Sequence, residues 1–146
     1  MIKIAGKEDL PRLCKEFSSW IGVRGEQYEP IDIASEMSRT YLNGTIIYAE
    51  NDDGKVIGLL GALPIIPLWT GKKTAIEHVW FVLPEYRNSG VGMKMLEVME
   101  EWAKKYGCSS VMLSPSRYGS DDPGRVRDIL TQHGYDLFAY QLNKEL

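Results

Sequence analysis

Hydrophobic positions recur along this chain with two different periods. Apolar residues that return about every three to four positions predict amphipathic helices, whereas short runs rich in β-branched and aromatic residues predict strands. The predicted helices span 7–20, 31–42, 93–106 and 123–133, and the predicted strands span 1–5, 45–50, 56–66, 72–83 and 110–114. A final strand or hairpin is predicted over 135–144. The order of elements is therefore β-α-α-β-β-β-α-β-α-β.

Two of the predicted strands have the pattern of a hairpin. Asn51-Asp-Asp-Gly54 separates two apolar runs and has the composition of a tight turn. Gly58 and Gly61 weaken the second of these strands because they offer no side chain to pack. Pro64 and Pro67 cannot donate a hydrogen bond to a neighbour, so this strand is expected to fray or to lie at an edge of the sheet.

The predicted helix 93–106 has one clear apolar face, and Gly107 is placed to end it. The residues expected on its buried face are Met95, Leu96, Met99, Trp102 and Ala103. Large aromatic rings usually serve packing, so the other tryptophans are also expected in the core or at its rim. They are Trp20, Trp69 and Trp80.

The most informative segment follows the apolar run 79–83. The chain breaks at Pro84, passes through Arg87-Asn-Ser-Gly-Val-Gly92 and enters the predicted helix. The first N–H groups of a helix have no intrahelical partner and lie at the positive end of its dipole, so they can bind an anion. The glycines let a ligand approach the backbone closely, and Arg87 adds a planar cation that suits phosphate oxygens. The segment therefore predicts a pyrophosphate site.

Two other phosphate-binding loops fit this segment less well. A dinucleotide-binding fold requires G-x-G-x-x-G early in a βαβ unit, but Met95 stands at the third glycine and the loop lies past the middle of the chain. A Walker loop requires G-x-x-x-x-G-K-[ST], and no glycine of the sequence is followed by Lys and then Ser or Thr in that frame. Both loops are disfavoured.

The segment resembles the acetyl-coenzyme A loop of the GCN5-related N-acetyltransferase (GNAT) family. The matching residues are the strand end Val82-Leu-Pro-Glu-Tyr86, the loop 87–92 in the family's [QR]-x-x-G-x-[GA] form, and the helix that follows. Gly134-Tyr135 is similar to the Gly-Phe/Tyr pair that closes the family's last helix. The resemblance covers nearly the whole chain and implies one α/β (α+β) domain over 1–146, with a mixed, mostly antiparallel sheet flanked by helices.

The resemblance also implies that acetyl-coenzyme A is the cosubstrate. Its pantetheine arm is expected to pair, like an added strand, with the backbone of Phe81, Val82 and Leu83, where side-chain identity matters little. Its pyrophosphate is expected on the amides at the start of the next helix. The residues assigned to that contact are Arg87, Asn88, Ser89, Gly90, Val91, Gly92 and Met93.

Transfer to an amine requires a proton acceptor, because an ammonium ion is not a nucleophile. Glu77 is the candidate base, and the alternative is a solvated strand residue. Strand alternation places Glu77 on one face with Phe81, and His78 on the other face with Trp80. The family's usual carboxylate falls at or beside Ile76, so Glu77 takes its position only through a one-residue offset such as a bulge.

Two roles are considered for His78. The preferred one is a structural histidine whose nitrogens are hydrogen-bonded, and the alternative is a base, which the near-neutral pKa of histidine would suit.

The chain departs from the family at the group that protonates the leaving thiolate. The family's usual Tyr, four residues before the Gly of the Gly-Phe/Tyr pair, is Leu130 here. Tyr118 is the candidate replacement, and Ser116 and Tyr135 are alternatives. The thiolate can also leave without an acid, since its pKa is modest compared with that of an alkoxide.

Composition excludes several classes of protein. A length of 146 residues suits one domain, and a net charge of -3 argues against a dominant nucleic-acid surface. No apolar stretch could span a bilayer and no signal peptide is recognisable, so we expect a cytoplasmic protein without membrane or nucleic-acid partners. Cys14 and Cys108 have the spacing of neither a disulfide nor a metal framework, and no metal is expected.

The expected function is acetyl-coenzyme A-dependent transfer of an acetyl group directly to a primary amine of a small molecule or a protein. The segment 22–29 between the first two helices is expected to bind the acceptor. Candidate acceptor contacts are Trp20, Arg24, Glu26, Tyr28, Glu29 and Asp32. The alternative function is a non-catalytic acyl-coenzyme A-binding or protein-interaction module on the same fold, and a homodimer is the default assembly.

Overall fold

A computed structural model of the chain describes residues 1–23, 30–116 and 119–146. This part of the chain divides into two compact units, Met1–Met112 and Leu113–Leu146, and each unit is described by itself. The first unit holds the sheet and the predicted phosphate loop.

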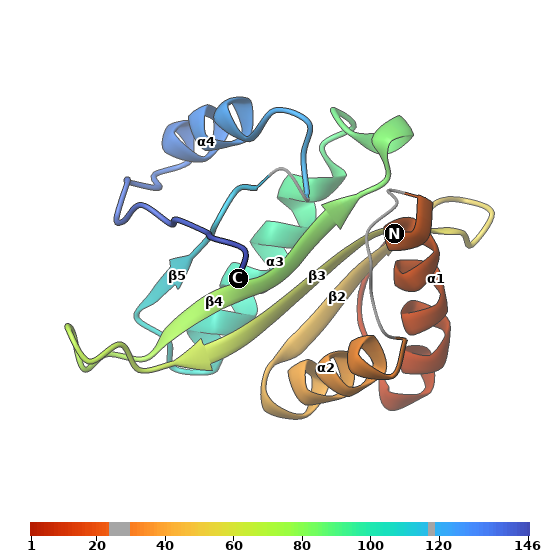
Figure 1. Cartoon of the computed structure of the whole chain (residues 1–146), viewed down its shortest axis with the longest axis horizontal. Helices are drawn as coiled ribbons and strands as arrows, with labels where there is room; N and C mark the ends of the chain where they lie inside the picture. The colour runs from red at the N-terminus through yellow and green to blue at the C-terminus, as the bar shows by residue number, and fades with distance from the viewer. Residues whose placement is uncertain (24–29, 117–118) are drawn as a thin grey trace. The chain divides into compact units, whose positions relative to one another are not determined.

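The first unit is built on a five-stranded sheet with the strand order β1-β2-β3-β4-β5 (Figure 1). The strands are β1 (Ile2–Ile4), β2 (Thr45–Glu50), β3 (Val56–Ile65), β4 (Thr74–Val82) and β5 (Ser110–Met112). The first four strands pair antiparallel with their neighbours, and β5 pairs parallel with β4. The sheet is therefore mixed and mostly antiparallel, which confirms the expected fold class.

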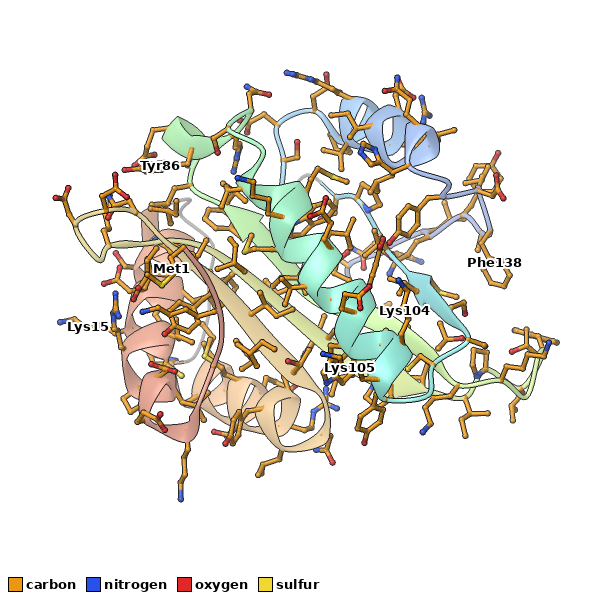
Figure 2. All side chains as sticks on the ribbon, turned by 180° about the vertical axis from the view of Figure 1, so that it is seen from behind. Met1, Lys15, Tyr86, Lys104, Lys105 and Phe138 are labelled. Carbon is orange, nitrogen blue, oxygen red and sulfur yellow. The ribbon has the colours of Figure 1, made fainter. Side chains whose placement is uncertain are left out.

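Helices cover both faces of this sheet. They are α1 (Leu10–Val23), α2 (Pro30–Asn43) and α3 (Val91–Lys105), with short 3-10 turns at η1 (Lys7–Asp9) and η2 (Pro84–Tyr86). Trp20 of α1 stacks on Phe81 of β4, whereas Gly92 of α3 faces Trp80. Neighbouring strand residues point to opposite faces, so α1 and α3 lie on opposite sides of the sheet, as Figures 1 and 2 show. No helix among the described residues is long and apolar enough to cross a membrane.

The strand β3 is an inner strand, which corrects the expectation of a frayed or edge strand. It pairs with β2 on one side and β4 on the other, and residues 56–63 are buried. A Cβ on Gly58 would lie 2.9 Å from Met95 Cε, and a Cβ on Gly61 would lie 3.1 Å from Thr40 Cγ2. These glycines therefore allow α3 and α2 to pack closely on the two faces of the strand.

The predicted apolar face of α3 is confirmed at four of its five positions. Met95, Leu96, Met99 and Ala103 are buried. Trp102 is half-buried and stacks on Tyr106, with ring centroids 5.1 Å apart.

One tryptophan departs clearly from the expected place in the core or at its rim. Trp20 is buried and Trp80 is half-buried, but Trp69 is 92% exposed in the turn between β3 and β4.

The second unit contains α4 (Pro123–Gln132). Asp122 begins the helix, because its Oδ1 accepts a hydrogen bond from the N–H of Arg125 at 3.0 Å. The strand predicted over 135–144 is wrong, since residues 135–146 form neither helix nor strand. A strand needs ladder hydrogen bonds to a partner, and the described residues supply none to this segment.

Candidate active site

The predicted phosphate loop is the junction between β4 and α3 (Figure 1). After η2 the chain passes through Asn88 at φ 70° and Gly90 at φ 83°, and α3 begins at Val91. Asn tolerates this left-handed region, and Gly adopts it without a steric penalty. The two left-handed residues turn the chain from the end of the strand into the helix.

The start of α3 presents backbone donors without acceptors. The N–H of Lys94 makes the first hydrogen bond of the helix, to Gly90 O at 3.1 Å. Among the described residues, the N–H groups of Gly90, Gly92 and Met93 have no acceptor, and that of Val91 has only Ser89 Oγ at 3.4 Å. Such a row of donors at the positive end of a helix suits an anion.

The two glycines of the loop have different structural roles. Gly90 needs its positive φ, although a Cβ there would meet no other atom. Gly92 has ordinary helical geometry, and a Cβ there would lie 3.6 Å from atoms of Trp80 and Val82, which is normal van der Waals contact. The backbone conformation therefore requires glycine at position 90, whereas protein packing leaves room for a methyl group at position 92.

Arg87 is held beside the loop by the end of β4. Its Nε donates to Val82 O at 3.0 Å, and its guanidinium carbon lies 5.6 Å from the centroid of the Phe81 ring. Phe81 in turn stacks on Trp20, with centroids 4.9 Å apart and an interplanar angle of 25°. A cation on an aromatic face is favoured, so this stack positions the positive charge next to the donor row.

Among the described residues, one edge of β4 has no strand partner next to this loop. The pairing with β5 covers only Thr74–Ile76, whereas β4 continues to Val82. The N–H of Leu83 donates to Ile57 O of β3 at 2.9 Å, so Leu83 and, by alternation, Phe81 turn their backbone groups toward β3. Of the three residues predicted to contact pantetheine, Val82 is the one whose backbone faces the other edge.

The strand β4 contains one extra residue relative to β3. Ala62 pairs with Glu77, and the adjacent Gly61 pairs with Val79, so His78 has no residue opposite it. This register shift is a β-bulge. The strand thus contains a bulge directly after Glu77, and the assignment of Glu77 to the place of the family's carboxylate stays a prediction.

The bulge overturns the strand faces predicted from simple alternation. Directly paired residues share a face of the sheet, so Glu77 lies on the same face as Ala62. That face also carries Trp80 and is covered by α3, whereas Phe81 lies on the opposite face. His78 turns the other way and contacts α2. An inserted residue interrupts the two-residue period of the strand, which strict alternation cannot anticipate.

His78 is hydrogen-bonded by α2, as expected for a structural histidine. Its Nδ1 lies 2.8 Å from Thr40 Oγ1, which itself donates to Glu36 O. Because that hydroxyl has one proton, the network assigns Nδ1 as the protonated nitrogen of His78. Nε2 lies 3.5 Å from Glu36 Oε2, and a hydrogen bond from Arg39 lowers the pKa of this carboxyl group.

Neither this network nor the ring stack beneath Arg87 follows from the pattern of the sequence. Thr40 and His78 are 38 positions apart, and no periodicity connects them. Only the i, i+4 spacing of Glu36 and Thr40 on one predicted helix face was available as a signal.

The remaining site candidates are described only in part. Tyr118 lies outside the described residues, so its role as an acid stays a prediction. Leu130, at the family's usual Tyr position, is 4% exposed. Arg24, Glu26, Tyr28 and Glu29 also lie outside the described residues.

The cysteines behave as partly buried thiols. Cys14 Sγ lies 3.3 Å from Met37 Sδ, and burial raises the pKa of both Cys14 and Cys108. In the described ranges, no three His, Cys, Asp or Glu side chains gather as a metal site.

Comparison with known proteins identifies one family. Residues 10–120 match the Acetyltransferase (GNAT) family. Human N-acetyltransferase 8 is 29% identical over 82 residues, which are 54% of this chain and 36% of that protein. Mouse thialysine N-epsilon-acetyltransferase is 36% identical over 50 residues, which are 34% of this chain and 29% of that protein. The aminoglycoside N(6')-acetyltransferase type 1 of Acinetobacter genomosp. 13 is 29% identical over 99 residues, which are 62% of this chain and 67% of that protein.

The matches to the human and mouse proteins span about a third of their lengths. A solved Trypanosoma brucei acetyltransferase has a TM-score of 0.73 at 15% identity, covering 100% of this chain and 99% of that one. An aminoglycoside acetyltransferase from an uncultured soil metagenomic sample, in complex with sisomicin, has a TM-score of 0.74 at 15% identity, covering 100% and 95%. These structures share the fold, and the family match covers most of the sequence. The chain belongs to the GNAT family of acetyltransferases, which use acetyl-coenzyme A as cosubstrate.

Proposed function

We propose that this protein moves an acetyl group from acetyl-coenzyme A directly to a primary amine. The observation that carries the proposal is the row of unpartnered N–H groups at the start of α3, next to an edge of β4 without a strand partner. The donor row suits a pyrophosphate, and the open edge suits an extended chain of amides such as pantetheine. The relatives named for aminoglycosides and thialysine support an amine acceptor.

The cosubstrate contacts are assigned to the loop and to the strand end. Within the predicted segment from Arg87 to Met93, the N–H groups of residues 90–93 hold the pyrophosphate, because those of Arg87 and Ser89 already donate to Pro84 O and Tyr86 O. The Arg87 guanidinium adds a fixed positive charge. Val82 offers its N–H at the open edge, where its carbonyl oxygen already accepts from Arg87 Nε, while Phe81 and Leu83 hold the strand against β3. Main-chain contacts of this kind give affinity with little demand on side-chain identity.

Glu77 is assigned as the proton acceptor. An acceptor ammonium gives its proton to the carboxylate, directly or through a water, and the neutral nitrogen then bonds to the acetyl carbon as the carbon–sulfur bond breaks. The bulge sets the face of β4 on which the Glu77 side chain lies. Glu77 directly follows Ile76, the last residue of β4 that pairs with β5. Tyr118 is the proposed donor of a proton to the departing thiolate, and it regains a proton from the nitrogen as the amide forms.

The base is tested with a pair of neighbouring variants. Glu77→Gln is expected to lower kcat by about 10²-fold or more and to remove the acidic limb of the rate–pH profile, because the amide cannot accept the proton. His78→Gln is expected to keep that limb, and Glu97→Gln on the exposed face of α3 serves as the carboxylate control. The measurement is thiol release with a panel of aminoglycosides, polyamines and lysine analogues. If Glu77→Gln kept the wild-type rate–pH profile and His78→Gln lost its acidic limb, the base would be reassigned to His78.

A non-catalytic acyl-coenzyme A-binding module is the second candidate function. The buried Leu130 at the family's usual Tyr position favours it, because the common acid is missing. Such a module would bind acetyl-coenzyme A but release no thiol with any amine of the panel. Release with one amine class would exclude the module and name the acceptor class.

A further inference from the structure

The turn between β3 and β4 exposes large apolar side chains. Ile66, Leu68 and Trp69 are 61%, 97% and 92% exposed. Figure 1 shows that this hairpin extends beyond the neighbouring strands of the sheet. Exposed apolar groups that gather at one projecting point are unusual for a soluble domain and indicate an interaction site.

The turn is ordered by its own hydrogen bonds. Pro67 O accepts from the N–H groups of Thr70 and Gly71, at 3.2 and 2.8 Å, and Gly71 takes a φ of 63°. Leu68 and Trp69 therefore occupy the central positions of a defined turn, where Gly, Asn, Asp and Ser are the usual residues. The backbone holds the two apolar side chains outward at little further entropic cost on binding.

Cations flank the exposed side chains. No acidic residue occurs from Gly54 to Ile76, and Lys72 and Lys73 follow the turn directly. Lys73 Nζ donates to Tyr106 O at 3.3 Å, which places the base of the hairpin beside the last turn of α3. That turn carries Lys104 and Lys105, labelled in Figure 2, of which Lys104 pairs with Glu101 at 2.8 Å. This end of the first unit is cationic, although the net charge of the chain is -3.

We propose that the β3–β4 turn binds the surface of an anionic phospholipid bilayer, with Leu68 and Trp69 in the interface and Lys72 facing the headgroups. Tryptophan favours the membrane interface, and lysine is attracted by anionic lipids. A stable protein interface takes about 800 Å² from each partner, which a convex tip with three apolar side chains does not offer. This proposal departs from the expectation of no membrane partner, which was based on the absence of a spanning stretch and of a signal peptide.

The test is flotation of the full chain with vesicles of phosphatidylcholine alone or mixed with phosphatidylserine. Wild-type protein is expected to float with the mixed vesicles at low salt, and less at high salt because the lysine contribution is screened. The double variant Leu68→Ser/Trp69→Ser is expected to bind about tenfold more weakly, since it loses the apolar contact. Lys72→Glu is expected to weaken binding to the mixed vesicles. Leu42→Ser, which removes a 76% exposed leucine at the end of α2, is the matched control and should bind like wild type.

Two results would overturn the proposal. One is wild-type protein that floats with neither vesicle, and the other is a double variant that floats as well as wild type. Self-association that the double variant abolishes, without any flotation, would assign the turn to a second copy of the chain instead. A blue shift of Trp69 emission on vesicle addition, lost in Trp69→Phe, gives an independent readout. None of these residues belongs to the proposed transfer site, so the outcome is separate from that of the activity measurements.

Discussion

Gly90 adopts a φ of 83° at the start of α3, in a region that side chains with a Cβ occupy at a cost of about 1–2 kcal/mol. The same residue directs the donor row of the loop, since the first turn of the helix follows it. Gly92 lies two positions later in ordinary helical geometry, with room for a methyl group against Trp80. The two glycines of one motif are therefore predicted to respond differently to substitution.

Gly90→Val is expected to weaken acetyl-coenzyme A binding by about tenfold or more, because the strained residue shifts the N–H groups that we propose as the pyrophosphate contact. Gly92→Ala is the control and is expected to bind nearly as wild type does. Isothermal titration of both variants with acetyl-coenzyme A measures the difference. Equal affinities for the two variants would show that the conformation of Gly90 does not position the ligand.

At the scale of elements, the junction of α2 and β2 depends on a close backbone approach. A Cβ on Gly44 would lie 1.9 Å from Ala62 O of β3, and a backbone oxygen cannot move aside without shifting the strand. A Cβ on Gly58 would lie 2.9 Å from Met95 Cε, which is the end of a flexible side chain. Gly44→Ala is therefore expected to lower the free energy of unfolding by about 1–3 kcal/mol, and Gly58→Ala by clearly less.

Urea denaturation of the two glycine variants checks this order. A Gly44→Ala protein as stable as wild type would mean that β2 and β3 separate more easily than their pairing indicates.

An ion-pair cluster connects β1 and α1 to the end of β2. Glu50 is 7% exposed and contacts Lys3 Nζ at 2.6 Å and Arg12 Nη1 at 2.7 Å. Hydrogen bonds from Lys3 and then Arg12 lower the pKa of the Glu50 carboxyl group below its usual value. Glu50 therefore adds stability above the pKa of the unfolded chain, about 4.3, and this contribution is lost as the pH falls through the folded-state pKa.

Glu50→Gln is expected to lower the free energy of unfolding by about 1–3 kcal/mol at neutral pH, with a smaller difference from wild type in acid. Glu85→Gln is the control, because its pair with Lys55 spans 3.5 Å between side chains that are both more than half exposed. Its effect is expected to stay within about 0.5 kcal/mol. Urea denaturation across the acid range measures both variants, and a Glu50→Gln deficit that does not shrink in acid would contradict the assignment.

The sequence predicts some helices and strands more accurately than others. The strand Thr45–Glu50 has the predicted bounds, and α3 begins two residues before its predicted start. The predicted strand 135–144 is wrong because its apolar residues find no hydrogen-bonding neighbour among the described strands. Periodicity predicts which segments can form an element, whereas pairing decides whether a strand forms.

At the scale of the whole molecule, acetyl-coenzyme A is expected to stabilise the fold. A ligand at a hundred times its dissociation constant adds about 2.7 kcal/mol, which raises the Tm of a protein of this size by about 5–10 °C. Differential scanning fluorimetry with acetyl-coenzyme A, and with the Gly90→Val variant as control, measures this shift. An unchanged Tm for wild-type protein would contradict the cosubstrate assignment of the loop.

The sequence alone was sufficient for the family, the order of all elements but the last strand, and the position of the turn between β4 and α3. These features depend on neighbouring residues: a run of apolar positions, a Pro, an Arg and two glycines before an amphipathic helix. Tertiary structure alone decided the face on which Glu77 lies, the hydrogen bond of His78 to Thr40, the inner place of β3 and the exposure of Trp69. Each of these depends on which distant segment pairs with or covers the residue, and the local pattern of side chains does not contain that information.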